Sequence, residues 1–268
     1  MEIDDQDIAT LIYTSGTEAA PKGVMNTHRN YYSAITSFFL DADMRTEDVY
    51  LSTIPLYHVG GIIILTAFNF NGGTNIVTYV PNPVQMLELI PKHKVTFLVE
   101  PPTVYAGMTQ LPGFEDCDLS SIEKCLSFGA LINRPSMETW NKKAPGIQWW
   151  SYWGQSELSP LGITGKFKKT EELPNQDLRW IGKPMCTLET KLVDDKENDV
   201  PIGEIGEIVA RGPSVMLGYY KNEEKTKEAF KNGWLHTGDL AMMDEEGNYY
   251  FVDRKKDIVK SGGENVST

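Results

Sequence analysis

The chain has 268 residues, of which 41% are hydrophobic, 10% aromatic and 23% charged, and it carries a formal net charge of −12. This composition is typical of a packed globular protein and excludes disordered, collagen-like and coiled-coil proteins. The longest apolar run, residues 59–67, is far shorter than the roughly 18–20 residues of a membrane-spanning helix, and the lack of a basic stripe argues against nucleic acid as a partner.

The start of the chain and its cysteines indicate a cellular compartment. Residues 1–9 are acidic and lack the basic and apolar regions of a signal peptide. Cys117, Cys125 and Cys186 form no CxxC pair, which argues against a disulfide scaffold and against a structural zinc site. We therefore expect a reducing, cytoplasmic location.

Residues 1–175 alternate patterns of buried strands with patterns of helices. Strands are predicted at residues 8–13, 49–53, 74–80, 95–99, 122–128 and 148–152. Helices are predicted after an N-cap at Thr27, after Gly60-Gly61, after Asn82-Pro83, and at residues 102–109 and 134–143. The helix after Asn82 should bury Val84, Leu87 and Ile90. Strands separated by helices indicate a mostly parallel sheet.

The pattern changes near Pro174. Shorter strands are predicted at residues 189–193, 204–211, 240–243 and 249–252, with one helix at 222–230. The expected fold is therefore α/β, a mostly parallel sheet layered with helices (residues 1–175), followed by a small antiparallel, barrel-like subdomain (176–253). Residues 254–268 are expected to form a hinge and the start of a further domain.

The loop after the first predicted strand is rich in hydroxyl groups and glycine. It contains Thr14, Ser15, Gly16 and Thr17, and Lys22 follows. Backbone N–H groups, hydroxyls and a lysine can together bind phosphate oxygens. The lysine is followed by glycine, so this is not a Walker loop. Composition by itself favours an ordinary polar connection here over a phosphate site.

Several segments in register carry a family resemblance. They are Y-T-S-G-T-E-A-A-P-K-G-V at 13–24, P-L-Y-H-V-G-G at 55–61, S-F-G-A at 127–130, W-G-Q-S-E at 153–157, G-E-I-V-A-R-G at 206–212, G-Y at 218–219, W-L-H-T-G-D at 234–239 and D-R-K-K-D at 253–257. In this order they resemble the motifs of the adenylate-forming superfamily, which includes acyl-CoA synthetases, aryl-CoA ligases, luciferases and peptide-synthetase adenylation domains. The resemblance extends over the whole chain.

The resemblance implies a role for each matching residue. The implied nucleotide-binding residues are Thr14, Ser15, Gly16, Thr17, Lys22, Gly129, Ala130, Trp153, Gly154, Gln155, Ser156, Asp239, Phe251 and Arg254. The implied catalytic residues are Thr14, His58, Glu157 and Lys256, with Glu157 and Thr14 also holding Mg²⁺. Lys256, Lys260, Gly262 and Gly263 are implied to serve the hinge or to contact CoA.

Residue types alone leave simpler interpretations open for several of these positions. Glu157 could be a solvated surface carboxylate, Trp153 a core side chain, and His58 a core histidine with satisfied hydrogen bonds. The remaining histidines match no motif that assigns them a role, and we expect surface or helix-start positions for His28, His93 and His236.

The chain departs from the family pattern in three places and in length. Glu18-Ala19 replaces Thr-Gly in the phosphate loop, Phe128 replaces a glycine beside the acyl pocket, and Asp253 replaces a glycine before the hinge arginine. Relatives have a longer segment before the phosphate loop and a domain after the hinge. We therefore expect the chain to be the middle part of a longer protein.

The resemblance implies that the whole protein activates a carboxylic acid, expected to be a fatty acid, with ATP and Mg²⁺. The acyl-AMP would then react with CoA, and a homodimer is possible. Two alternatives stay open, namely an adenylation domain that loads a carrier protein and a non-catalytic nucleotide or acyl binder, which the Glu18-Ala19 replacement favours.

Overall fold

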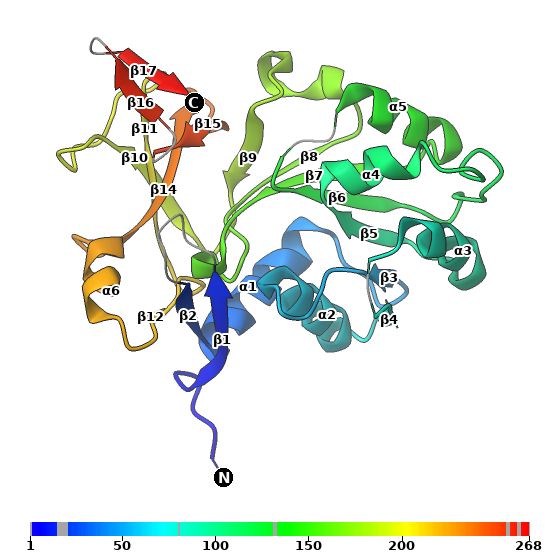
Figure 1. Cartoon of the computed structure of the whole chain (residues 1–268), viewed down its shortest axis with the longest axis horizontal. Coiled ribbons are helices and arrows are strands. Elements are labelled where there is room, and N and C mark those ends of the chain that lie inside the picture. Colours follow the sequence, from blue (N-terminus) through cyan, green and yellow to red (C-terminus); the bar gives the residue numbers. More distant parts are fainter. Residues whose placement is uncertain are drawn as a thin grey trace.

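The structure is a computed structural model and describes residues 2–14, 21–79, 81–130, 133–255, 258–261 and 264–267. Several residues discussed above lie outside these ranges, namely Ser15, Gly16, Thr17, Glu18, Ala19, Lys256, Gly262 and Gly263. Lys260 belongs to strand β16 (Ile258–Ser261), which pairs with β17 (Glu264–Ser267). Figure 1 shows a helix-covered half and a strand-rich half, joined by strands that continue from one to the other.

The chain opens with a hairpin that differs from the prediction. Strand β1 (Ile8–Thr14) pairs antiparallel with β2 (Lys22–Thr27), and β12 (Gly218–Tyr219) completes a three-stranded sheet. The prediction of a buried first strand was wrong, because β1 lies at the edge of this sheet and leaves Tyr13 62% exposed. Strand β2 was not predicted, and its pairing brings Lys22 opposite Thr14.

The predicted parallel sheet is present. Its strands are β3 (Val49–Ser52), β4 (Thr74–Val77), β5 (Phe97–Glu100), β6 (Lys124–Phe128) and β7 (Gln148–Trp153). Their order is β4-β3-β5-β6-β7, with every neighbouring pair parallel. Such a sheet needs helices on both of its faces.

Five helices cover the two faces of this parallel sheet (Figure 1). Helices α1 (His28–Asp41) and α2 (Val59–Asn71) pack on one face, and α3 (Pro83–His93), α4 (Pro102–Met108) and α5 (Arg134–Lys143) pack on the other. The side chains of β5 alternate accordingly, because Phe97 and Val99 join the core of α1 and α2, whereas Leu98 joins the core of α3 to α5.

Capping signals in the sequence located two helix starts correctly. Thr27 caps α1 through a capping box with Asn30, and the Asn82 side chain accepts from two backbone N–H groups at the start of α3. Leu87 and Ile90 of α3 are buried as predicted. Val84 was predicted to be buried but is 55% exposed, because it lies in the first turn of α3 rather than on the face that contacts the sheet.

The strand-rich half continues the large sheet with antiparallel pairs. Its elements are β8 (Ile163–Phe167), β9 (Trp180–Pro184), β10 (Glu189–Val193), β11 (Ile205–Arg211), α6 (Glu223–Ala229), β13 (Phe230–Lys231), β14 (Trp234–Met243), β15 (Tyr249–Arg254) and three 3₁₀ turns, η1 (Ser156–Leu158), η2 (Thr170–Glu172) and η3 (Pro174–Gln176). Among the described residues, the large sheet comprises 12 strands.

The predicted subdomain is antiparallel, but its pairings among the described residues form no closed barrel. The main path runs from β10 through β11, β14, β15, β9 and β8 to β7, and β13 pairs with β14 beside it. The domain boundary near residue 175 therefore stays a prediction, since the sheet continues across it. Within the described part of the chain, every helix is too short or too polar to cross a membrane.

Candidate functional site

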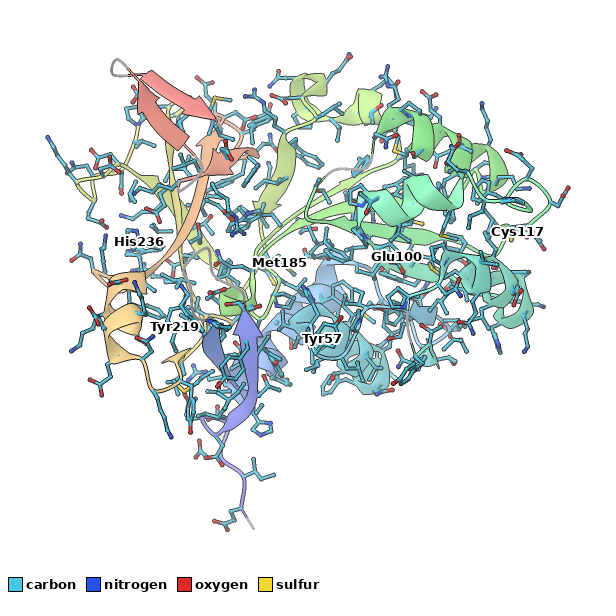
Figure 2. All side chains as sticks on the ribbon, viewed as in Figure 1. Tyr57, Glu100, Cys117, Met185, Tyr219 and His236 are labelled. Atoms are coloured by element: carbon cyan, nitrogen blue, oxygen red, sulfur yellow. The ribbon has the colours of Figure 1, made fainter. Side chains whose placement is uncertain are left out.

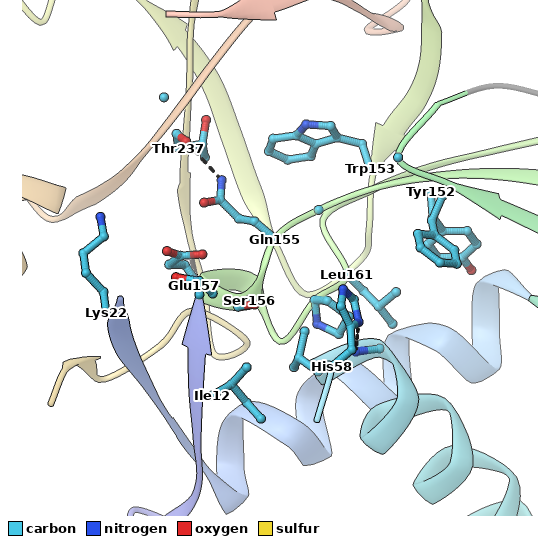
Figure 3. Close-up of a pocket in the computed structure, with 18 of the residues that line it drawn as sticks. Ile12, Lys22, His58, Tyr152, Trp153, Gln155, Ser156, Glu157, Leu161 and Thr237 are labelled. Carbon is cyan, nitrogen blue, oxygen red and sulfur yellow. Dashed lines mark hydrogen bonds between the residues drawn. The ribbon is translucent and has the colours of Figure 1, made fainter. Parts of the chain in front are cut away.

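A cavity of about 890 Å³ lies where the hairpin, the parallel strands and the antiparallel strands meet. It opens at the carboxyl ends of β6 and β7, the usual position of ligand sites in parallel sheets. Figure 3 shows Lys22 and Glu157 on one side of it and His58, Leu161 and Tyr152 on another. The cavity therefore has a polar side and an apolar side.

Glu157 forms the centre of the polar side. It lies in η1, directly after β7, and only 8% of it is exposed. The Tyr219 hydroxyl donates a hydrogen bond of 2.8 Å to Glu157 Oε1. The Lys22 ammonium group lies 4.7 Å from the centre of the Tyr219 ring. The structure thus excludes the surface interpretation of Glu157 and places a buried carboxylate near a lysine.

Asp239 of β14 holds a second buried carboxylate, directly behind the cavity-lining residues Trp153, Gly238 and Arg254. Trp153 Nε1 donates to Asp239 Oδ2 over 3.0 Å, and Arg254 Nε lies 3.2 Å from Oδ1. Oδ1 itself accepts no hydrogen bond of good geometry from the described residues. Burial raises the pKa of Asp239 to about 6, although the Arg254 charge and the Trp153 hydrogen bond oppose this shift.

The closely packed turn after β7, which includes Gly154 and Gln155, connects the two halves of the molecule. Gln155 Nε2 donates to the carbonyl oxygen of Thr237 over 3.3 Å, so the turn after β7 is tied to β14 (Figure 3). Gly154 comes so close to the backbone of Pro160 that a Cβ atom there would overlap the Pro160 carbonyl oxygen. Only glycine fits at this position, which explains one residue of the W-G-Q-S-E motif in physical terms.

His58 stands between the two sides of the cavity. It is the N-cap of α2, and its Nδ1 accepts a hydrogen bond of 3.0 Å from the backbone N–H of Gly60. Burial lowers the pKa of His58, which favours the neutral ring. Because Nδ1 accepts, we assign the ring proton of the neutral form to Nε2. His58 can therefore donate one hydrogen bond to a bound molecule.

The apolar side is formed by the α/β half. Its lining includes Ile54, Ile64, Val99, Leu126 and Leu161, all of which are buried. The Phe128 ring lies 6.3 Å from the His58 ring, centre to centre, and both residues line the cavity. The large side chain at position 128 thus borders the passage between the two sides.

The structure brings most of the described candidate residues together. The cavity lining includes Thr14, Lys22, His58, Gly129, Trp153, Gly154, Gln155, Ser156, Glu157 and Arg254. Asp239, Ala130 and Phe251 are outside the lining, although Asp239 contacts two lining residues, Trp153 and Arg254. Phe251 packs against the core of the strand-rich half instead. Trp153 both lines the cavity and belongs to that core, so its core interpretation is confirmed and its role toward a nucleotide stays a prediction.

One histidine expected at the surface is half-buried instead and lines the cavity. The His236 side chain (Figure 2) is 7% exposed and lies between two glutamates, with Nε2 2.9 Å from Glu197 Oε2 and Nδ1 3.2 Å from Glu207 Oε2. The prediction of a surface or helix-start position was wrong for this residue, because strand pairing places it beside β11. His28, in contrast, begins α1 and is exposed as expected.

Tyr219 and Glu207 were missed as site residues. Both belong to quoted motifs, but the sequence does not show that Tyr219 reaches Glu157 across 62 positions or that Glu207 reaches Gly238 across 31. The sequence did offer one signal for them: each is a polar side chain within a quoted motif for which the resemblance assigned no role.

Comparisons with known proteins identify relatives of the chain. A family model described as AMP-binding enzyme matches residues 1–220. The chain is 35% identical over 271 residues to a long-chain-fatty-acid–CoA ligase of Bacillus subtilis, covering 98% of this chain and 46% of that protein. It is 34% identical over 261 residues to a 2-succinylbenzoate–CoA ligase of Bacillus velezensis, covering 97% of this chain and 51% of that protein.

The solved structures agree with these relatives. O-succinylbenzoate coenzyme A synthetase from Bacillus subtilis, in complex with ATP and a magnesium ion, matches with a TM-score of 0.88 and 31% identity. The match covers 99% of this chain and 54% of that one. The chain thus spans about half the length of the relatives it matches.

Proposed function

The chain belongs to the AMP-binding enzyme family, and from this premise we propose that the full-length protein couples a carboxylic acid to CoA at the expense of ATP. A carboxylate oxygen attacks the α-phosphorus, the bond to pyrophosphate breaks, and acyl-AMP forms. The CoA sulfur then attacks the acyl carbon, and AMP leaves. The observation that carries the proposal is a single cavity with a buried carboxylate and a lysine on one side and buried apolar side chains on another.

We propose that the polar side binds the nucleotide. Trp153, Gly129 and Ala130 would lie against adenine, and Asp239 would accept hydrogen bonds from the ribose hydroxyls. Supporting this role, Asp239 Oδ1 is buried without a hydrogen-bond donor of good geometry in the described chain. The Arg254 side chain, which is 61% exposed, can move away from this oxygen when a ribose binds. Phe251 is outside the cavity lining, so it would support the nucleotide site through its packing in the core of the strand-rich half rather than by direct contact.

The donor set on the polar side fits magnesium bound together with phosphates. The described residues hold no group of three metal-ligating side chains, and Mg²⁺ is commonly held by one or two carboxylates plus substrate phosphates and water. Glu157 would provide the carboxylate and Thr14 a hydroxyl, with Lys22 contacting phosphate oxygens. When bound, the ion supplies positive charge beside the phosphates. The chain orients the nucleotide and the acid for attack.

We propose that the apolar side holds the body of the acid and that the acid is a fatty acid. The lining here is aliphatic and buried, which suits an alkyl chain. A substrate with a second carboxylate group would have to bury that charge here without its hydration. The neutral His58 would donate its Nε2 proton to the acid's carboxyl group. The long-chain-fatty-acid–CoA ligase among the relatives supports the same substrate class.

We also propose that the full-length protein binds CoA near the hinge, forms a homodimer and is cytoplasmic. The roles of Lys256, Lys260, Gly262 and Gly263 rest on the sequence motif.

Pyrophosphate exchange by the full-length protein tests the proposed function. We expect exchange that depends on Mg²⁺ and on an aliphatic monocarboxylic acid, followed by thioester formation when CoA is added. Exchange without transfer to CoA would indicate a domain that loads a carrier protein. Nucleotide binding without exchange would indicate a non-catalytic binder and would contradict the proposal.

A further inference from the structure

A buried glutamate lies directly behind the turn that carries Asp239. Glu207 of β11 is only 5% exposed. Its Oε1 accepts a hydrogen bond of 3.0 Å from the backbone N–H of Gly238, and its Oε2 accepts one of 2.8 Å from the Lys255 ammonium group. One carboxylate thus contacts both the residue before Asp239 and the residue after Arg254.

The backbone of this turn is held from a second side. The N–H of Lys255 donates to the carbonyl oxygen of Gly238 over 2.8 Å, and the Thr237 hydroxyl donates to the carbonyl oxygen of Ile208 over 2.6 Å. Gly238 itself has φ +73°, a left-handed conformation that a non-glycine residue adopts only with strain. Both polar backbone groups of Gly238 are therefore bound, and the direction of the next side chain, Asp239, depends on them.

The surroundings of Glu207 keep it ionised. Burial alone would raise its pKa, but hydrogen bonds from Lys255 and His236 and from the backbone of Gly238 hold the pKa of Glu207 below its ordinary value. The His236 ring, in turn, lies between Glu207 and Glu197. A carboxylate accepts from Gly238 with one oxygen and from Lys255 with the other, whereas an amide in the same place would turn its NH₂ group toward one of these donors.

We propose that Glu207 is a positioning residue for ribose recognition. It acts through the backbone of Gly238 and through Lys255 to hold the Asp239 carboxylate where it can accept the ribose hydroxyls. This inference rests on the proposed function, in which Asp239 binds the ribose. It assigns to the strand-rich half a share in nucleotide selectivity, through a residue that lines the cavity and acts on the direction of the Asp239 side chain.

Calorimetric titration of the full-length protein with AMP and with 2′,3′-dideoxy-AMP tests the proposal. The wild-type protein should bind AMP about tenfold or more tightly than the dideoxy analogue, because hydrogen bonds to a charged group add affinity. Asp239→Asn should reduce this ratio strongly. Glu207→Gln should also reduce the ratio, by about tenfold, while its affinity for the dideoxy analogue stays near that of the wild type.

A matched control is Glu204→Gln, which removes an exposed carboxylate from the same chain segment and should leave the ratio unchanged. If Glu207→Gln keeps the wild-type ratio while Asp239→Asn loses it, the proposal is overturned and the proposed function stands. An equal loss of affinity for both ligands in Glu207→Gln would show a merely structural role and would also overturn it. If the wild-type protein binds the two ligands equally well, Asp239 does not bind the ribose hydroxyls, and the proposal for Glu207 is overturned together with that role.

Lys255→Met keeps the test decisive if Glu207→Gln does not fold. This variant removes one partner of Glu207 but retains the backbone N–H that donates to Gly238. We expect the ratio to fall about threefold, as for the loss of one hydrogen bond that acts indirectly. An unchanged ratio in folded Lys255→Met would contradict the proposal.

Discussion

Two buried glutamates, one in each half of the molecule, have opposite electrostatic surroundings. Glu100 ends β5 in the α/β half (Figure 2), where the Thr53 hydroxyl donates to it, and burial raises its pKa to about 7. Glu207 of the strand-rich half contacts Lys255, and its pKa is lowered. Both side chains are almost completely buried. The difference shows that the partners of a buried carboxylate, rather than its burial alone, decide its charge near neutral pH.

The two halves also differ in the side chains that they contribute to the cavity. The α/β half contributes mostly buried apolar side chains, whereas the hairpin and the strand-rich half contribute Lys22, Tyr219, Arg254 and the residues around Asp239. Glu157 connects the two halves, because it follows β7 in the chain and accepts a hydrogen bond from Tyr219 of β12. The reaction that we propose needs both environments in one place.

The largest expected effect is at this junction. Glu157→Gln in the full-length protein should lower the rate of pyrophosphate exchange on the order of 10²–10³-fold, as for the loss of a charge that stabilises a transition state. The amide has nearly the same shape and still accepts from Tyr219, so the unfolding temperature should change little. The control is Glu138→Gln on the exposed side of α5. Exchange within threefold of the wild-type rate at saturating Mg²⁺ would contradict the role of Glu157.

The second effect concerns the stability of the α/β half. The pKa of Glu100 in the folded protein is raised from 4.5 to about 7, so the folded state binds this proton more tightly than the unfolded state. Stability from this group is therefore present below about pH 4.5 and is lost as the pH rises to about 7. Glu100→Gln should be more stable than the wild type at pH 8, by on the order of 3 kcal/mol.

Thermal unfolding of full-length wild type and Glu100→Gln, followed from pH 4.5 to pH 8, measures this difference. The two curves should converge at the acid end. A constant offset between them over the whole range would show that Glu100 does not titrate as its surroundings indicate.

The third effect tests the carboxylate that we assign to the ribose. Burial raises the pKa of Asp239 to about 6, and the ionised form accepts hydrogen bonds from the ribose hydroxyls more strongly than the protonated form, in which one oxygen carries a proton. The affinity for adenosine, which carries no phosphate, should therefore fall up to about tenfold for each pH unit below that pKa. Asp239→Asn should bind adenosine weakly and with a flat pH profile. Titration by fluorescence or calorimetry from pH 5 to pH 8 measures both, and a flat wild-type profile would contradict the assignment.

The smallest expected effect concerns the partner of Glu157. Tyr219→Phe removes the hydroxyl that donates to Glu157 Oε1 and keeps the ring beneath the Lys22 ammonium group. Because second-shell hydrogen bonds orient metal ligands, the Mg²⁺ concentration that gives half-maximal exchange should rise roughly two- to tenfold, which corresponds to one hydrogen bond. Tyr220→Phe is the control, since Tyr220 is partly exposed. An unchanged Mg²⁺ dependence would show that Tyr219 does not orient Glu157.

The amino-acid sequence by itself determined the elements whose signals are local. The N-caps at Thr27 and Asn82 and the alternation of strands and helices predicted α1, α3 and the parallel sheet, because capping and hydrophobic periodicity act within a few residues. The roles that the motifs imply also fall on ten residues that line the cavity. The motifs point to the site because binding needs particular side chains, such as a lysine or a carboxylate, at particular places along the chain.

Only the tertiary structure decided which distant residues meet. Strand β2, the position of His236 beside β11 and the contacts of Tyr219 and Glu207 all depend on pairing between segments that are separated in the chain. No local pattern encodes such a contact, since a glutamate in a strand looks the same whether it faces water or a lysine. The charge state of Glu100 and of Glu207 follows from that choice of neighbour, and so it is a property of the fold.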